Sequence, residues 1–98
     1  MKRIVAKRTI REFWVKHHDS KDYLETWYET ARGARWEKPS DIQDFYAAVS
    51  ILKNSRVVFN IKGNDYRLVA KINYRKQWLF IRFIGTHIEY DKIDANTI

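Results

Sequence analysis

A short segment near the end of the sequence gathers side chains that can move protons, namely His87, Glu89 and Tyr90. Imidazole gains and loses a proton close to neutral pH, which makes His87 a candidate general acid or base. Arg67 offers a guanidinium fork that matches a phosphate group. A base, an acid and a fixed cation are what RNA needs to be cleaved by its own 2′-hydroxyl. His87, Tyr90 and Arg67 can cover these roles without a metal, although a lone histidine is more often structural.

Other kinds of site find no support in the sequence. It contains no cysteine, so disulfides and cysteine-ligated zinc are excluded. His17 and His18 are adjacent, and adjacent side chains on a helix point about 100° apart, so they do not chelate one ion together. No glycine-rich phosphate loop and no nucleophile elbow is present. We therefore expect neither a metal nor a cofactor.

The charge balance favours a polyanionic partner. Lysine and arginine total 19 against 12 acidic residues, which gives a net charge of +7. The alternative is a merely soluble surface, since small domains often carry a net charge of roughly 2–8. No apolar run approaches the roughly 18 residues of a membrane span, and the N-terminus lacks the apolar stretch of a secretory signal. We expect a cytoplasmic protein that does not engage a membrane.

Apolar residues at helical spacing dominate the N-terminal half. They predict a short strand at 4–6 and a helix over about 7–17. A second helix follows a break and N-cap at Asp19-Ser20 and ends at Gly33. A third, short helix opens at Pro39, where Ser40 and Gln43 match a capping box. The apolar stripes of the first two helices contain Trp14, Trp27 and Tyr28, which we interpret as core residues rather than RNA-stacking residues.

The C-terminal half is rich in β-branched and aromatic residues. Strands are predicted at 57–62, 66–74 and 78–85, with tight turns between them and a short helix near 89–93. Helices followed by consecutive strands indicate an α+β fold, and 98 residues fit a single domain spanning 1–98. The helices are expected to cover one face of an antiparallel sheet, which leaves the other face for solvent or a ligand.

Alternation along the strands assigns side chains to the two faces. In the strand at 66–74, Arg67 and Lys71 point away from the helices. In the last strand we expect Leu79, Ile81 and Phe83 to face the helices, so that Arg67, Lys71 and Arg82 converge on the open face. Trp78 and Phe80 on that face could stack on bases. The alternative is a solvated strand face with snorkelling lysine and arginine stems.

Three segments together resemble one protein family. They are Arg3-Ile4-Val5, the run F-N-I-K-G-N-D-Y-R-L at 59–68, and the run I-R-F-I-G-T-H-I-E-Y-D-K at 81–92. They are similar to HigB-type toxins of the RelE-like superfamily, over essentially the whole chain. The resemblance implies a small RelE-like fold and an endoribonuclease that cuts mRNA, usually on translating ribosomes. It further implies a metal-independent reaction leaving a 2′,3′-cyclic phosphate, and a HigA-type helix-turn-helix antitoxin as partner.

The resemblance also assigns roles to individual residues. Arg67 would stabilise the phosphate, and His87 would act as general acid or base, with Tyr90 as its helper or as a stacking platform. Glu89 is either a base or a carboxylate that complements a helix N-terminus. The remaining expected RNA contacts are Lys62, Asn64, Lys71, Arg82 and Lys92. Two other functions stay open: a non-catalytic RNA-binding module, and a protein-interaction domain that binds an acidic partner such as an antitoxin.

Overall fold

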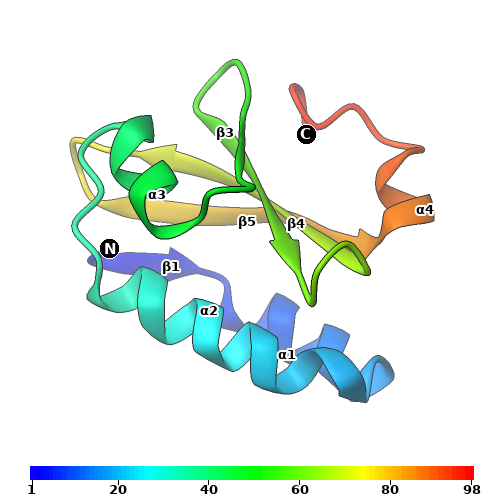
Figure 1. Cartoon of the computed structure of the whole chain (residues 1–98). Helices are drawn as coiled ribbons and strands as arrows, with labels where there is room; N and C mark the ends of the chain where they lie inside the picture. Colours follow the sequence, from blue (N-terminus) through cyan, green and yellow to red (C-terminus); the bar gives the residue numbers. More distant parts are fainter.

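The computed structural model describes residues 1–98 and shows an α+β architecture (Figure 1). The helical elements precede most of the strands, as the sequence predicts. In chain order the elements are β1 (Arg3–Val5), α1 (Lys7–Lys16), the 3₁₀ turn η1 (His18–Ser20), α2 (Lys21–Gly33), α3 (Pro39–Phe45), β2 (Ser50–Ile51), β3 (Arg56–Ile61), β4 (Tyr66–Asn73), β5 (Trp78–Thr86) and α4 (His87–Tyr90). None of the helices is long and apolar enough to cross a lipid bilayer.

The strands form one five-stranded sheet in the order β1-β5-β4-β3-β2. The antiparallel meander of β3, β4 and β5 confirms the prediction, and the two-residue strand β2 extends it at one edge. At the other edge β1 pairs with β5 in parallel, with Arg3 opposite Trp78. The sheet is therefore mixed: its antiparallel part agrees with the prediction, and the parallel pairing of β1 is an addition that the sequence does not predict.

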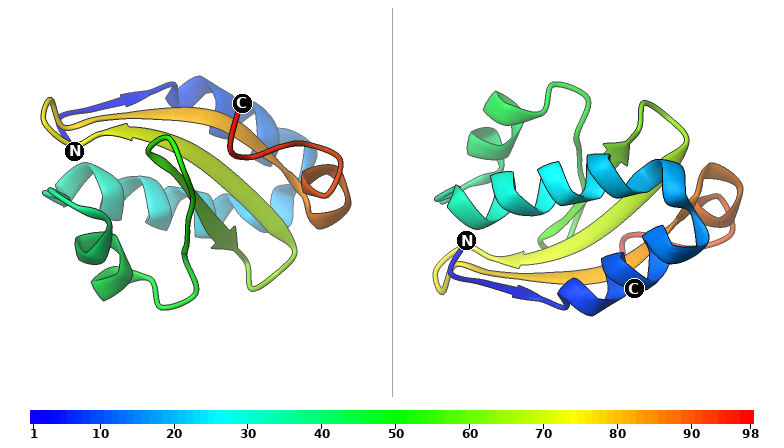
Figure 2. Two further views of the ribbon diagram at one scale, coloured as in Figure 1. Left: turned by 90° about the horizontal axis from the view of Figure 1, so that it is seen from above. Right: turned by 90° about the horizontal axis from the view of Figure 1, so that it is seen from below.

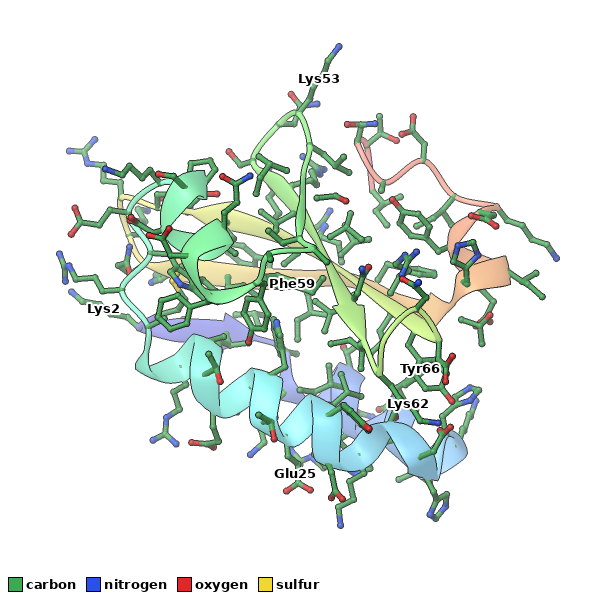
Figure 3. All side chains as sticks on the ribbon, viewed as in Figure 1. Lys2, Glu25, Lys53, Phe59, Lys62 and Tyr66 are labelled. Atoms are coloured by element: carbon green, nitrogen blue, oxygen red, sulfur yellow. The ribbon has the colours of Figure 1, made fainter.

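The main core lies between the sheet and the helices α1, α2 and α3, as the views in Figure 2 show. At its centre Phe59 is almost fully buried (Figure 3). Its ring centroid lies 5.3 Å from that of Trp27, 6.0 Å from that of Trp36 and 5.4 Å from that of Tyr46. Each such aromatic pair adds about 0.5–1.5 kcal/mol beyond its buried area. The tryptophan stripe of the helices is thus core, as predicted.

The predicted helix starts are only partly right. Ser20 precedes α2, but its hydroxyl donates to the carbonyl oxygen of His17 at 2.6 Å instead of accepting from the helix. In α3, Pro39 occupies the first turn and the N-cap is the residue before it, so Ser40 already lies inside the helix. The predicted capping box between Ser40 and Gln43 is therefore absent.

A β-bulge between β4 and β5 changes the predicted faces of β5. Val69 pairs with Phe83 but Ala70 pairs with Ile81, which leaves Arg82 as the extra residue. Beyond this bulge the alternation is inverted. Phe83 turns away from the helices and Ile84 turns toward the main core, the reverse of the sequence prediction.

The face opposite the helices is not fully open. Val58 and Val69 are buried there under Ala95, together with Phe83 and Tyr90. The C-terminal segment, residues 91–98, lies across this part of the sheet (Figure 2). Its end is fixed by the guanidinium of Arg56, which donates to the main-chain oxygen of Ile98 at 3.0 and 2.5 Å. The expectation of one continuous exposed face is wrong.

Candidate active site

Arg67 projects from the face of β4 that points away from the helices. Its guanidinium carbon lies 5.8 Å from the ring centroid of Tyr90, and its Nη1 donates to Asn64 Oδ1 at 3.3 Å. Directly opposite in β5 stands Gly85, which has no side chain to cover the guanidinium. A Cβ on Gly85 would lie 2.6 Å from Phe83, so the local packing requires glycine there. The structure therefore brings Arg67, Asn64 and Tyr90 together.

The short helix α4 begins at His87, earlier than the sequence predicted, because Thr86 caps it. Thr86 Oγ1 accepts from the main-chain N–H of Glu89 at 3.2 Å, and Glu89 Oε1 accepts from the N–H of Thr86 at 2.8 Å. This reciprocal capping box satisfies two helix-end donors. The pKa of Glu89 is lowered, and the largest cause is the hydrogen bond from the main-chain N–H of Thr86. Glu89 is thus a capping carboxylate, as the second of its two predicted roles proposed.

His87 is paired with Asp91, one helical turn further along. His87 Nδ1 lies 3.1 Å from Asp91 Oδ2, and both side chains are about half exposed. A carboxylate at Nδ1 favours the tautomer that carries its proton there and leaves Nε2 as an acceptor. The main-chain N–H of His87 also donates to the carbonyl of Asp65 at 3.3 Å, which ties α4 to the β3–β4 turn. The sequence reasoning missed Asp91, although a histidine and an aspartate four apart on a helix are a detectable signal.

Lys62 lies in a polar cluster beside the expected site. Its Nζ is 2.9 Å from Asp19 and 3.4 Å from Asp65, and the Tyr66 hydroxyl donates to Asp19 at 2.6 Å (Figure 3). The Tyr66 hydroxyl and then the Lys62 ammonium lower the pKa of Asp19, and Asp19 raises the pKa of Lys62. Lys62 joins η1 to the turn before β4, where Gly63 has the expected positive φ of 63°. Its predicted phosphate contact would have to displace these carboxylates.

Lys71 and Arg82 lie elsewhere on the same face. They line a hollow of about 530 Å³ together with Phe80. Lys71 is four residues beyond Arg67, or about 13 Å at the usual strand rise. The apolar cluster under the C-terminal segment lies between them. Lys71 and Arg82 thus converge as predicted, but Arg67 does not join them.

The other predicted residues are also on or near the surface. Lys92 is exposed just after α4, and its main-chain N–H donates to the Glu89 carbonyl at 3.2 Å. His17 is stacked on Phe13 with a centroid distance of 4.3 Å. No group of three or more histidine, cysteine or acidic side chains is arranged to hold a metal ion. The groups available for chemistry are therefore a guanidinium over the Tyr90 ring and a histidine–aspartate pair on the same short helix α4.

Comparison with known proteins shows the family of the chain. The family model of the HigB toxin, described as the RelE-like toxic component of a toxin–antitoxin system, matches residues 20–93. The chain belongs to the HigB toxin family. The matched region contains every site residue discussed above from Lys62 to Lys92. Membership in a HigB toxin–antitoxin family implies a cognate antitoxin as partner.

Characterised HigB relatives extend the match to nearly the full length. The mRNA interferase toxin HigB of Escherichia coli strain K12 is 26% identical over 94 residues, covering 94% of this chain and 90% of that protein. The mRNA interferase HigB of Shigella flexneri matches to the same extent. The mRNA interferase HigB of Escherichia coli O6:H1 is 25% identical over 92 residues, covering 92% of this chain and 89% of that protein. The RelE-like HigB fold proposed from the sequence motifs is confirmed.

Proposed function

We propose that this chain is an mRNA endoribonuclease, the toxin of a type II toxin–antitoxin pair. The observation that carries the proposal is the guanidinium of Arg67 over the ring of Tyr90, a residue of the same four-residue helix that holds the His87–Asp91 pair at its end. The net charge of +7 suits an RNA substrate. The names of the HigB relatives, all mRNA interferases, support the same substrate.

In the proposed reaction His87 Nε2 takes the proton of a ribose 2′-hydroxyl, and the 2′-oxygen attacks the adjacent phosphorus. The bond from phosphorus to the 5′-oxygen then breaks. A proton reaches that oxygen, leaving a 2′,3′-cyclic phosphate and a 5′-hydroxyl. Arg67 holds the phosphate oxygens through two N–H groups while negative charge accumulates on them. The scheme needs only side chains.

Tyr90 and Asp91 prepare these groups. The Tyr90 ring supports the Arg67 guanidinium from one side, and its hydroxyl is our candidate to protonate the leaving oxygen. Asp91 is a positioning residue that fixes the tautomer of His87. Asn64, Arg82, Lys71, Lys92 and Lys62 are proposed RNA contacts, with Asn64 closest to the chemistry because it is hydrogen-bonded to Arg67.

The proposal extends to partners and place of action. A HigA-type helix-turn-helix antitoxin would neutralise the toxin, and translating ribosomes in the cytoplasm would present the mRNA. All of this rests on membership in the HigB family.

Transcript mapping after induction in a bacterial host tests the activity. The unmodified chain should arrest growth and produce new 5′ ends by primer extension. Arg67→Ala should lower the cleavage rate by about 10²–10³-fold, because one charge-stabilising donor set is removed. His87→Ala should lower it by about 10²–10⁴-fold. Arg11→Ala, an exposed cation on α1, is the matched control and should cut normally.

Two outcomes would contradict the proposal. Growth arrest by a folded Arg67→Ala/His87→Ala variant equal to the unmodified chain would indicate binding without catalysis. Absence of cleavage with purified ribosomes and of salt-dependent RNA affinity would indicate a protein-interaction domain. Tyr90→Phe separates two roles within the site. It keeps the ring under Arg67 and removes the hydroxyl, so a loss of cleavage in this variant assigns the proton transfer to Tyr90.

A further inference from the structure

A second group of cations lies at the far end of the sheet, beyond the C-terminal segment. From Tyr66 to Ile88 the sequence contains no acidic residue. The turn between β4 and β5 contributes Arg75 and Lys76, and the paired edge strand β1 contributes Arg3. With Lys71 and Arg82 these residues form what we call the distal cationic patch.

The patch faces the same side as Arg67. Ile4 packs in the main core, so its neighbour Arg3 points to the opposite face. The Arg3 guanidinium carbon lies 5.3 Å from the Trp78 ring centroid, and Lys76 Nζ lies 5.1 Å from it. Trp78 thus gathers two cations that belong to different elements, at about 0.5–1 kcal/mol for each exposed pair. The prediction that Trp78 stacks on bases is less favourable, since its ring already contacts two cations.

No carboxylate balances this charge. None of the five cations lies within ion-pair distance of an acidic group, whereas Lys62, Arg8 and Arg35 all do. Glu37 is on the loop that accepts a hydrogen bond from Gln77, but it is paired with Arg35 at 3.1 Å. Five uncompensated cations on a rigid surface indicate an anionic partner with several charges.

The shape of the distal cationic patch indicates which class of anion it binds. It extends over three adjacent strands, or about 10 Å, and a similar distance along β5. Proteins that hold single-stranded RNA combine a basic groove with free aromatic faces for the bases. Here the Trp78 ring contacts two cations. Two aromatic residues line the hollow, and Tyr74 is packed against the main core, which leaves Phe80. Double-helical RNA is instead recognised by its shape and its phosphates.

We propose that the distal cationic patch binds the phosphate backbone of double-helical RNA, as an anchor separate from the cleavage site. The inference rests on the proposed function only in taking RNA as the common partner. The apolar cluster at Val69 and Phe83 separates the two places, so a strand held at Arg67 does not continue flat across the sheet. The anchor sets affinity and orientation, and the site at Arg67 carries out the chemistry.

Fluorescence anisotropy with a 2′-O-methyl RNA duplex and its single strand tests the anchor, because neither probe can be cut. The variant Arg3→Gln/Arg75→Gln/Lys76→Gln should weaken duplex binding at least about tenfold at physiological salt. The slope of log affinity against log salt should fall by about one for each phosphate that the variant no longer neutralises. Single-strand binding should weaken less. Arg11→Gln/Lys16→Gln/Lys21→Gln removes the same charge from exposed helical positions and should leave the duplex slope unchanged.

The charge-reversed pair Arg75→Glu/Lys76→Glu is confined to an exposed turn and tests the same point if the triple variant unfolds. Equal losses of affinity in the patch and control variants would overturn the proposal, and so would a greater loss for the single strand than for the duplex. Arg67→Gln distinguishes the two hypotheses, because it should abolish cleavage and keep duplex binding. If the chain binds the duplex but never cleaves RNA, the proposed endoribonuclease activity is contradicted and the proposed duplex-binding patch is supported.

Discussion

Replacing Thr86 with alanine should lower the rate of RNA cleavage, although Thr86 is not one of the proposed catalytic residues. The Thr86 side chain is hydrogen-bonded to Glu89 and not to Arg67 or His87, but Thr86 is the N-cap of α4, the four-residue helix that carries His87 and Tyr90. The alanine variant loses the hydroxyl that accepts from the Glu89 N–H. Glu89 Oε1 can still accept from the main-chain N–H of residue 86, so the variant breaks one hydrogen bond of the capping box and keeps the other.

The size of the effect follows from the hydrogen bond that the Thr86 hydroxyl accepts. Removing an N-cap hydroxyl costs about 0.5–2 kcal/mol, and measured threonine caps reach the upper end of this range. A cost of about 1–2 kcal/mol raises the open population of α4 roughly 5–30-fold. One helical turn has little other support, because a short isolated helix is marginal in water. The opening should therefore be local.

Amide hydrogen exchange measures this opening directly. In Thr86→Ala the amides of residues 89–91 should exchange roughly 5–30-fold faster, while the amides of β3 and β4 should keep their protection. RNA cleavage should fall because His87 and Tyr90 are held less often in place. Thr86→Ser keeps the capping oxygen and is the matched control, with exchange and cleavage close to the unmodified chain. Unchanged exchange at 89–91 in Thr86→Ala would refute the view that the capping box positions the site.

Three further predictions follow from packing and charge. Gly85→Ala should lower the free energy of unfolding by about 1–3 kcal/mol, because the new methyl group meets Phe83, and a urea midpoint equal to wild type would contradict this. Asp19 is stabilised as a carboxylate, so its contribution is present above its ordinary pKa of 3.8 and is lost as the pH falls through the lower value of the folded state. Asp19→Asn should therefore flatten the acid limb of urea midpoints measured from pH 7 to pH 3. Ala95→Asp places a charge in the buried contact with Val69, and it should speed amide exchange in residues 91–98 while β4 stays protected.

How far the sequence predicts the site depends on how local each signal is. The alternation in β4 is unambiguous, so it places Tyr66 and Leu68 in the core and Arg67 on the opposite face, as the structure has them. Near the bulge the pattern is ambiguous, since Phe83 and Ile84 are both apolar and either can face the core. Local hydropathy cannot locate an extra residue there, so the predicted faces of Phe83 and Ile84 are wrong.

The two matches to the capping-box pattern also show that a local sequence signal does not always predict the structure. Thr86 and Glu89 match the capping pattern and form the box, whereas Ser40 and Gln43 match it and do not. The difference is Pro39, which takes the first helical position and moves the N-cap back by two residues, from Ser40 to Lys38. The parallel pairing of β1 has no local signal, because it depends on a strand far along the chain.

That pairing has a consequence for the order of assembly. Arg3 meets its partner strand only at Trp78, so the edge of the sheet closes one of the longest loops in the chain. Contacts between distant segments form late because the entropy of closing the loop must be overcome first. The hairpins of β3, β4 and β5 are local and can form without the N-terminus. Arg3 is on β1, which pairs late. The site at Arg67 should therefore form during folding before the distal cationic patch is complete.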